Sequence, residues 1–167
     1  MDDNERIDTV VGQWAAERPD VDLAAMTLMA RLSHAADLVN ARIERLAKEY
    51  GVSRADGDVV LTLRRSGEPY RLSPTAIARS LLMTTGTMTG RLDRLEKLGL
   101  IARVPNDTDR RGVDIQLTPE GLRQSDIAIT RHNDLLKEIS GLLTPADRIE
   151  LDQLTRQLVS GIGALEP

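Results

Sequence analysis

SPTAIARSLLMTTGTMTGRLDRLEKLGLIARVPNDTDRRGVDIQLT, residues 73–118, carries the clearest pattern in the chain. Its first part predicts a short helix over residues 75–81, a break, and a second helix over 85–98 that Gly99 ends. Two extended segments follow, residues 100–104 and 113–117, and the second alternates apolar and polar residues as a half-buried strand does. The charged residues 105–112 between them predict a turn. The stretch therefore predicts two helices in tight succession and then a β-hairpin.

This order of elements is typical of a winged helix-turn-helix, in which the second helix lies in the major groove of DNA. The start of that helix is rich in threonine, and small hydroxyl side chains can approach base edges and phosphates closely. Leu92, Leu95 and Leu98 are expected to face inward. Arginines on the outer face extend a cationic edge, although they could also form only a solvated helix face. The expected DNA-contacting residues are Ser73, Thr75, Thr84, Thr85, Thr87, Thr89, Arg91, Arg94, Arg110 and Arg111.

Arg110 and Arg111 lie together at the predicted tip of the hairpin. An arginine at a protruding tip can enter a narrow minor groove, where the potential of DNA is most negative. The charge of the whole stretch is modest, because seven basic and five acidic side chains give residues 73–118 a net charge of +2 in a chain whose net charge is −4. Charge alone would therefore be a weak argument for DNA binding.

Helices also flank this stretch. Apolar spacings of three and four residues predict helices over residues 5–17, 23–50, 53–65, 119–141 and 146–163. Ser73, Thr118 and Thr144 each precede a proline, which predicts an N-cap with proline at the first helical position. Ser53 with Asp56 predicts a capping box. We expect a mainly α fold with a small β-hairpin, composed of N-terminal helices (1–50), a DNA-binding lobe (51–118) and C-terminal dimerisation helices (119–167).

The composition excludes several classes of protein. The chain has 167 residues and no cysteine, so disulfides and thiolate metal sites are excluded. It has one Trp, two Tyr and no Phe, which favours a helical core of aliphatic residues. No apolar run approaches the length needed to cross a bilayer, and the start of the chain is acidic where a signal peptide is basic. We expect a cytoplasmic protein that does not enter a membrane.

No constellation of residues predicts catalysis. The two histidines, His34 and His132, are each isolated among helical residues, which favours neither a metal site nor a catalytic triad. The threonine-rich segment 84–89 lacks the Gly-Lys-Ser/Thr ending of a phosphate-binding loop. We therefore expect neither enzyme activity nor a cofactor or metal. A winged helix that docks on protein is an alternative, although such a wing would more often carry apolar residues than Arg110 and Arg111.

The same stretch resembles the MarR-type (multiple antibiotic resistance regulator) family. The matching motifs are LSP at residues 72–74, GTMTGRLDRLEKLGLIAR at 86–103, DTDRRG at 107–112 and LTPEG at 117–121. Gly90 departs from the pattern, since many members carry a polar residue there, and a glycine within a helix costs about 1 kcal/mol against alanine. The resemblance covers nearly the whole chain. It implies a regulator, usually a repressor, that binds DNA as an obligate dimer with interleaved terminal helices.

Dimerisation also has support in the residues themselves. The helices predicted at 23–50, 119–141 and 146–163 offer more apolar surface than one DNA-binding lobe could cover. A two-fold homodimer would place its recognition helices about 34 Å apart on a palindromic operator. We therefore expect two partners, double-stranded DNA and a second copy of the chain.

The resemblance extends to a urate-responsive subgroup of that family. Members of the subgroup share a tryptophan on an extra N-terminal helix, an aspartate in the second helix, an arginine in the recognition helix and another arginine entering the wing. This chain is similar at all four places, with Trp14, Asp58, Arg91 and Arg103. An indole can stack on a flat ligand, and arginines can bind an anion through paired hydrogen bonds.

These residues imply a small-molecule effector, either urate or another small anion such as a tricarboxylate or a phenolic acid. An anion bound at Arg91 would break its expected pairing with Asp58 and shift the recognition helix. Each residue also has a purely structural interpretation. Trp14 could pack in an apolar stripe, and Asp58 could be a surface acid near the positive end of a helix.

Overall fold

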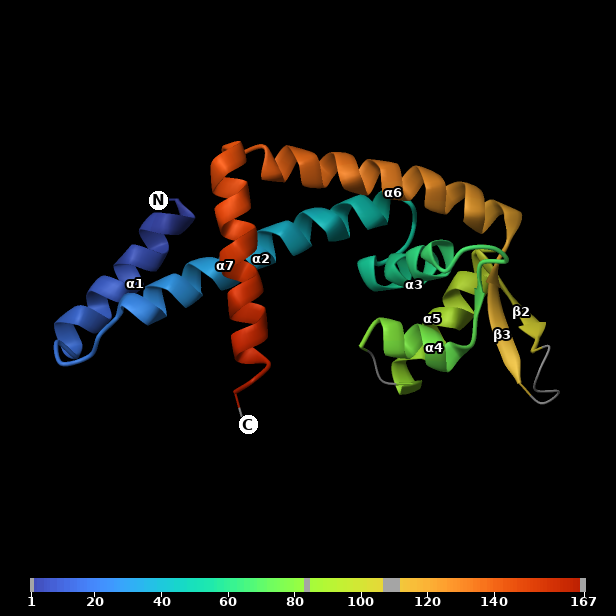
Figure 1. Ribbon diagram of the computed structural model, residues 1–167, viewed down its shortest axis with the longest axis horizontal. Helices are drawn as coiled ribbons and strands as arrows, with labels where there is room; N and C mark the ends of the chain where they lie inside the picture. Colours follow the sequence, from blue (N-terminus) through green and yellow to red (C-terminus); the bar gives the residue numbers. More distant parts are fainter. Residues whose placement is uncertain (1, 83–84, 107–111, 166–167) are drawn as a thin grey trace. The chain divides into compact units, whose positions relative to one another are not determined.

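The computed structural model describes residues 2–82, 85–106 and 112–165. In this part the chain forms seven helices and three short strands (Figure 1). The helices are α1 (Asp3–Glu17), α2 (Ala24–Glu49), α3 (Arg54–Arg65), α4 (Pro74–Ser80), α5 (Thr85–Lys97), α6 (Pro119–Ser140) and α7 (Pro145–Ile162), and the strands are β1 (Arg71–Leu72), β2 (Ile101–Pro105) and β3 (Val113–Leu117). The mainly α fold with a small β-hairpin is confirmed.

The helix ends follow the local chemistry of the sequence. The hydroxyl groups of Ser73, Thr118 and Thr144 each accept a hydrogen bond from the backbone N–H three residues later, at 2.9–3.2 Å. Proline follows each of them at the start of the helix, where its missing N–H leaves no bond unmade. After the C-terminal ends of α2 and α5, Gly51 and Gly99 adopt the left-handed conformation, each with a φ of 71°.

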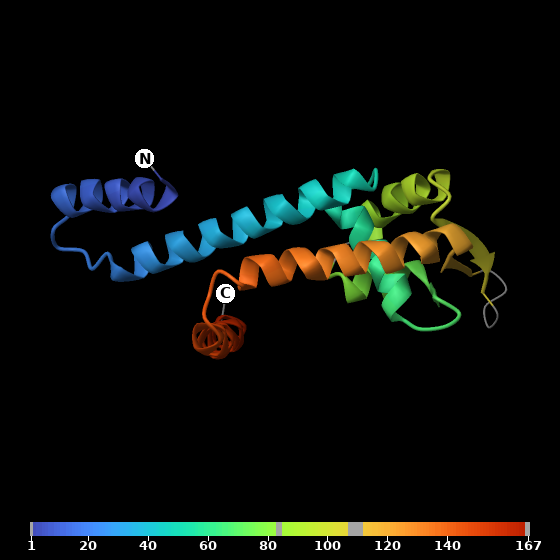
Figure 2. The same cartoon turned by 90° about the horizontal axis from the view of Figure 1, so that it is seen from above.

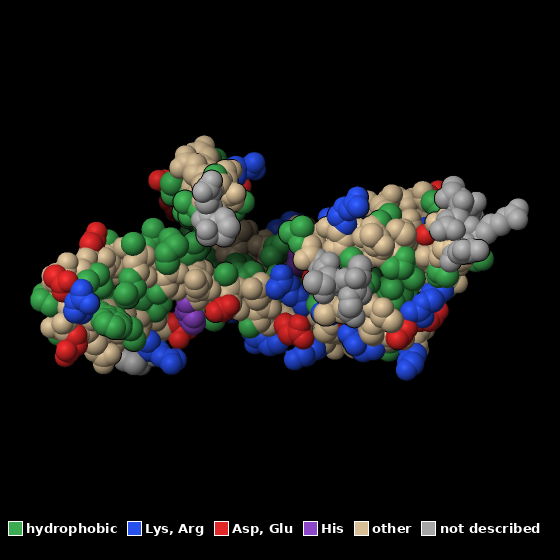
Figure 3. All heavy atoms as spheres, turned by 90° about the horizontal axis from the view of Figure 1, so that it is seen from below, with side chains coloured by type: hydrophobic (Ala, Val, Ile, Leu, Met, Phe, Trp, Pro, Cys, Tyr) green, Lys and Arg blue, Asp and Glu red, His purple; other side chains and the backbone are tan. Residues whose placement is uncertain are grey.

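The chain divides into two compact units, Met1–Arg54 and Ala55–Pro167. In the first unit α1 and α2 lie side by side as a helical hairpin (Figure 2). Ion pairs join the two helices, from Asp8 to Arg31 at 2.5 Å and from Asp3 to His34 at 3.0 Å. Neither helix has a buried residue, and hydrophobic side chains gather on the surface of this unit (Figure 3). The division into three functional parts stays a prediction.

The second unit contains an antiparallel sheet with the strand order β1-β3-β2. The expected hairpin is formed by β2 and β3, whose register runs from Ile101 opposite Leu117 to Pro105 opposite Val113. The strand β1 adds to the other edge of β3 through two residue pairs. The sequence did not predict β1, because a two-residue strand shows no periodicity.

Aliphatic residues of α3, α4, α5 and the sheet form the hydrophobic core of the second unit. Its buried members are Val59, Val60, Leu63, Ile77, Ala78, Met88, Leu92, Leu95, Leu100, Ile101, Ile115 and Leu117. The first turn of α6 approaches this core closely, since a Cβ atom built on Gly121 would lie 1.9 Å from the carbonyl oxygen of Leu100. Along the described residues, no helix has the length and the apolar character that a membrane crossing requires.

Candidate nucleic-acid interface

The helix α5 has a buried face and an exposed face. Met88, Leu92 and Leu95 are at most 3 % exposed and face the core. Thr87 and Thr89 lie exposed on either side of this buried face. Leu98, expected on the inner face, is 51 % exposed, because α5 ends one residue earlier at Lys97 and the chain turns there. The exposed surface of α5 thus carries hydroxyl groups that can approach bases and phosphates in a DNA groove.

Three of the other residues predicted to contact DNA lie at the beginnings of the two helices of the helix-turn-helix, α4 and α5. Ser73 is the N-cap of α4, and Thr75 lies exposed in its first turn. Thr85 is the first residue of α5. Thr84, Arg110 and Arg111 lie outside the described residues. The roles of these residues in DNA binding stay predictions.

Asp56 joins α3 to the arginines of α5. Its carboxylate is buried, and its Oδ1 accepts hydrogen bonds from Arg91 Nη1 at 3.2 Å and from Arg94 Nη2 at 3.0 Å. Its Oδ2 accepts a third bond, from Arg94 Nε at 3.2 Å. This pairing raises the pKa of Arg94 above its usual value. A buried carboxylate needs such partners, because an unpaired one would lose its solvation without compensation.

The expected pairing of Arg91 with Asp58 is wrong, because Arg91 pairs with Asp56 instead. The two aspartates are two positions apart on α3, and residues with that spacing point to different sides of a helix. Asp58 is half-buried on the same helix. Arg91 is only partly satisfied by its pairing, since its buried Nε has no hydrogen-bond partner among the described residues.

Arg103 joins β2 to another side of α5. Its Nη2 donates a hydrogen bond to Asp93 Oδ1 at 2.6 Å, and its Nη1 donates to Glu96. The bond to Asp93 is the main reason that the pKa of Arg103 lies above its usual value. Both arginines predicted to bind an anion are therefore already bound to carboxylates, and both contacts hold α5 in place.

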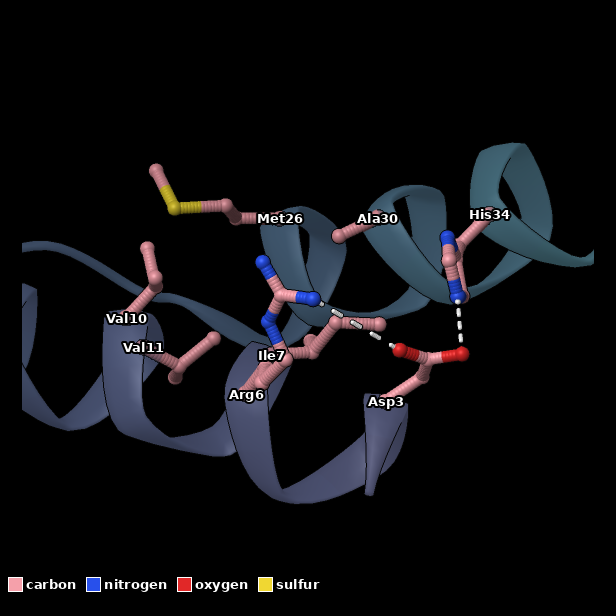
Figure 4. Close-up of a pocket in the computed structure, with 8 residues that line it drawn as sticks. All are labelled: Asp3, Arg6, Ile7, Val10, Val11, Met26, Ala30 and His34. Carbon is pink, nitrogen blue, oxygen red and sulfur yellow. Dashed lines mark ion pairs between the residues drawn. The ribbon is translucent and has the colours of Figure 1, made fainter. Parts of the chain in front are cut away.

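Trp14 lies in the first unit, on α1, and is 48 % exposed. A pocket of about 340 Å³ opens between α1 and α2 (Figure 4) and is lined by Asp3, Arg6, Ile7, Val10, Val11, Met26, Ala30 and His34. Its walls are mainly apolar, and Asp3 closes one end through its ion pair with His34. Trp14 is not among the lining residues. Within the described ranges, no cluster of three or more potential metal ligands is present.

Comparison with known proteins agrees with this geometry. The model of the MarR family matches residues 50–112, which contain the helix-turn-helix and the first strand of the wing, β2. The HTH-type transcriptional regulator PecS of Dickeya dadantii is 34% identical over 148 residues, which are 89% of each chain. This chain belongs to the MarR family. It is a DNA-binding transcriptional regulator, as the sequence predicts, and not an enzyme.

More distant relatives match most of the chain. The transcriptional repressor MprA of Escherichia coli K12 is 27% identical over 73% of this chain and 69% of its own. A crystal structure of the MarR mutant C80S from E. coli, complexed with operator DNA, has 27% identity and a TM-score of 0.65. It covers 83% of this MarR-family chain and 99% of its own.

Sequence reasoning missed the acids that hold the site together. Asp56 was predicted only as part of a helix cap, and no residue spacing indicated its bonds to two arginines of α5. Asp93 and Glu96 lie three positions apart on α5, so they share one face of that helix. That spacing is a signal for a shared cationic partner, although it does not say which arginine supplies it.

Proposed function

We propose that this MarR-family protein is a ligand-responsive repressor that binds a palindromic operator as a homodimer. The exposed threonines Thr87 and Thr89, which flank the buried apolar face of α5, are the observation that carries the DNA-binding surface. The repressor role has the support of the relative MprA, which is described as a transcriptional repressor. The cytoplasmic location stays a prediction from the sequence.

Two groups of residues supply the DNA contacts in this proposal. Hydroxyl groups and arginines of the helix-turn-helix contact base edges in the major groove and the DNA phosphates. These residues are Ser73, Thr75, Thr84, Thr85, Thr87, Thr89, Arg91 and Arg94. Arg110 and Arg111 of the wing enter the minor groove. Of the two arginines of α5, Arg94 is the better placed for phosphate, since its side chain is 56 % exposed and that of Arg91 is 21 % exposed.

The proposed dimer is supported by apolar surface that each unit leaves exposed. In the first unit Val10, Trp14 and Leu28 are 48–59 % exposed. In the second, Ile149 and Ile162 of α7 are about 60 % exposed, and that helix has no buried residue. Exposed apolar surface of this extent marks an interaction site. A second copy would cover it and set the spacing of the two recognition helices.

The proposed effector is a small anion, urate among the candidates, that binds Arg91 and Arg103. Both arginines now hold α5 through carboxylates, Arg91 through Asp56 and Arg103 through Asp93. An anion would compete with these carboxylates and release the recognition helix from its present position. Trp14 and Asp58 were predicted together with these arginines, and their roles in ligand binding stay predictions.

Fluorescence anisotropy on the upstream region of its own gene tests DNA binding. Replacing Arg110 and Arg111 with alanine should weaken binding and lower the salt slope by about two, one for each cation lost from the DNA interface. The matched control replaces Arg123 and Arg131 of α6, two exposed arginines, and should change the slope little. Equal slopes for wild type and the wing variant would contradict the proposed wing.

Thermal shift with urate, xanthine, salicylate and aconitate tests the effector site. We expect stabilisation by at least one of these ligands, and its loss in Arg91→Ala and Arg103→Ala. Arg94→Ala is the control, because it also removes bonds to Asp56 but no predicted ligand contact. Stabilisation that survives in both test variants would contradict the proposed site.

A further inference from the structure

Asp114 is a buried acid at the root of the wing, and neither the DNA contacts nor the effector site use it. It lies on β3 opposite Val104 of β2 and is 7 % exposed. Its Oδ2 accepts a hydrogen bond from Arg71 Nε at 3.1 Å, and its Oδ1 accepts one from Asn106 Nδ2 at 2.9 Å. Both carboxylate oxygens are therefore bonded, which a buried carboxylate requires.

The two partners of Asp114 belong to different parts of the lobe. Arg71 lies on β1, two residues before the N-cap Ser73 of α4, and so at the beginning of the helix-turn-helix. Asn106 follows β2, and its backbone N–H donates to the carbonyl of Gly112 at 3.0 Å, which closes the root of the wing. Asp114 thus connects the root of the wing to the strand that leads into α4.

The charge of Asp114 makes this position informative. A carboxylate in a DNA-binding lobe repels phosphates, so electrostatics alone predicts that its removal tightens DNA binding. Arg71 compensates that charge through its pairing, and its side chain is 20 % exposed. The bonds of Asp114 run between a strand and a loop root, so they can fix how the wing and the helix-turn-helix are placed on DNA.

We propose that Asp114 is a positioning residue for DNA binding, which holds the wing root and β1 together through Asn106 and Arg71. The proposal rests on the proposed DNA contacts of the wing. It predicts an effect of opposite sign to simple electrostatics, because loss of the carboxylate costs more through misplacement of the wing than it gains through reduced repulsion.

Fluorescence anisotropy with operator DNA tests whether loss of the Asp114 carboxylate weakens or tightens binding. The proteins compared are wild type, Asp114→Ala, Asp114→Asn and Glu68→Gln. Asp114→Ala should bind roughly tenfold more weakly, the effect expected for a lost hydrogen bond to a charged group. Asp114→Asn keeps one hydrogen-bond acceptor, so its affinity for the operator should lie between those of wild type and Asp114→Ala. Glu68→Gln removes an exposed acid of the same unit and should bind as wild type or slightly more tightly. Circular dichroism and melting temperature establish that each variant is folded.

Amide hydrogen exchange on the free protein tests the connection without DNA. The N–H of Asn106 should exchange at least about tenfold faster in Asp114→Ala, because the loop root loses a restraint. Asp114→Asn serves the same purpose if the alanine variant does not fold. If wild type binds no operator, the proposed function fails, whereas this exchange still reports on the connection. Folded variants that bind DNA as tightly as wild type, or unchanged exchange at Asn106, would overturn the proposal.

Discussion

The N-terminal helical hairpin and the winged lobe differ most in what they bury. The helices α1 and α2 bury no residue, and Met26 and Leu28 are 42 % and 59 % exposed. The buried hydrophobic residues of the described chain all lie between Val59 and Leu117. The lobe therefore holds its own fold, whereas the hairpin needs apolar surface from elsewhere. This difference fits a regulator in which one region reads DNA and the other pairs two copies.

The largest expected effect is on the core of the lobe. Leu95→Ala removes a side chain with 0 % exposure and should lower the free energy of unfolding by about 2–5 kcal/mol. Leu28→Ala makes the same truncation on the hairpin, at a position that is 59 % exposed within one chain, and should cost the fold of the single chain at most about 0.5 kcal/mol. Urea unfolding measures both. Equal losses in the two variants would show that the surface of α2 is as well packed as the core.

Replacing a glycine with alanine should change stability in opposite directions in the lobe region and in the hairpin. Gly121→Ala places a Cβ 1.9 Å from the Leu100 carbonyl oxygen and should cost about 1–3 kcal/mol. Gly12→Ala on α1 meets nothing within 4 Å and should stabilise the helix by about 0.5–1 kcal/mol. Thermal unfolding measures both. A destabilising Gly12→Ala would indicate that a neighbouring surface packs tightly against this side of α1.

Self-association should respond to the exposed apolar positions of the hairpin and not to its polar ones. Leu28→Glu places a charge on the exposed apolar surface of α2 and should weaken dimerisation by roughly tenfold, since burying an unpaired charge is costly. Gln13→Glu adds the same charge at an exposed polar position of α1 and is the control. Sedimentation equilibrium gives both dissociation constants. Unchanged association in Leu28→Glu would exclude this part of α2 from the dimer interface.

The smallest expected effect is a pH dependence of stability that arises from Glu120 at the start of α6. Hydrogen bonds from Arg123 and then Gln124 lower the pKa of Glu120 from 4.5 to about 2. A lowered pKa in the folded state means that the stabilisation is complete above pH 4.5 and is lost as the pH falls toward 2. Glu120→Gln should remove this part of the pH dependence of stability. An NMR titration of Glu120 with a midpoint near 4.5 would contradict the expected pairing.

The elements with local signals were predictable from the sequence. Ser73, Thr118 and Thr144 cap their helices as predicted, and Gly51 and Gly99 end theirs. These features depend on the chemistry of a few neighbouring residues. The core positions of α5 followed from helical periodicity until the helix ended before Leu98.

The features that depend on distant residues were not predictable. Strand alternation places Asp114 on the outside of β3, whereas it is buried between Arg71 and Asn106. The choice of Asp56 over Asp58 depends on how α3 is rotated against α5, which no local pattern fixes. A site made of charged side chains from several elements therefore needs the three-dimensional structure.

Operator titrations with altered half-site spacing test the central claim most directly. A palindromic operator should be bound tightly when its half-sites lie one helical turn apart, because a fixed homodimer sets that distance. Inserting about half a turn of DNA between them should weaken binding by at least about tenfold, since only one lobe can then contact its half-site. Equal affinity for both spacings would show that each lobe binds DNA by itself. That result would contradict a homodimer in which the winged lobes bind DNA and the other helices fix their spacing.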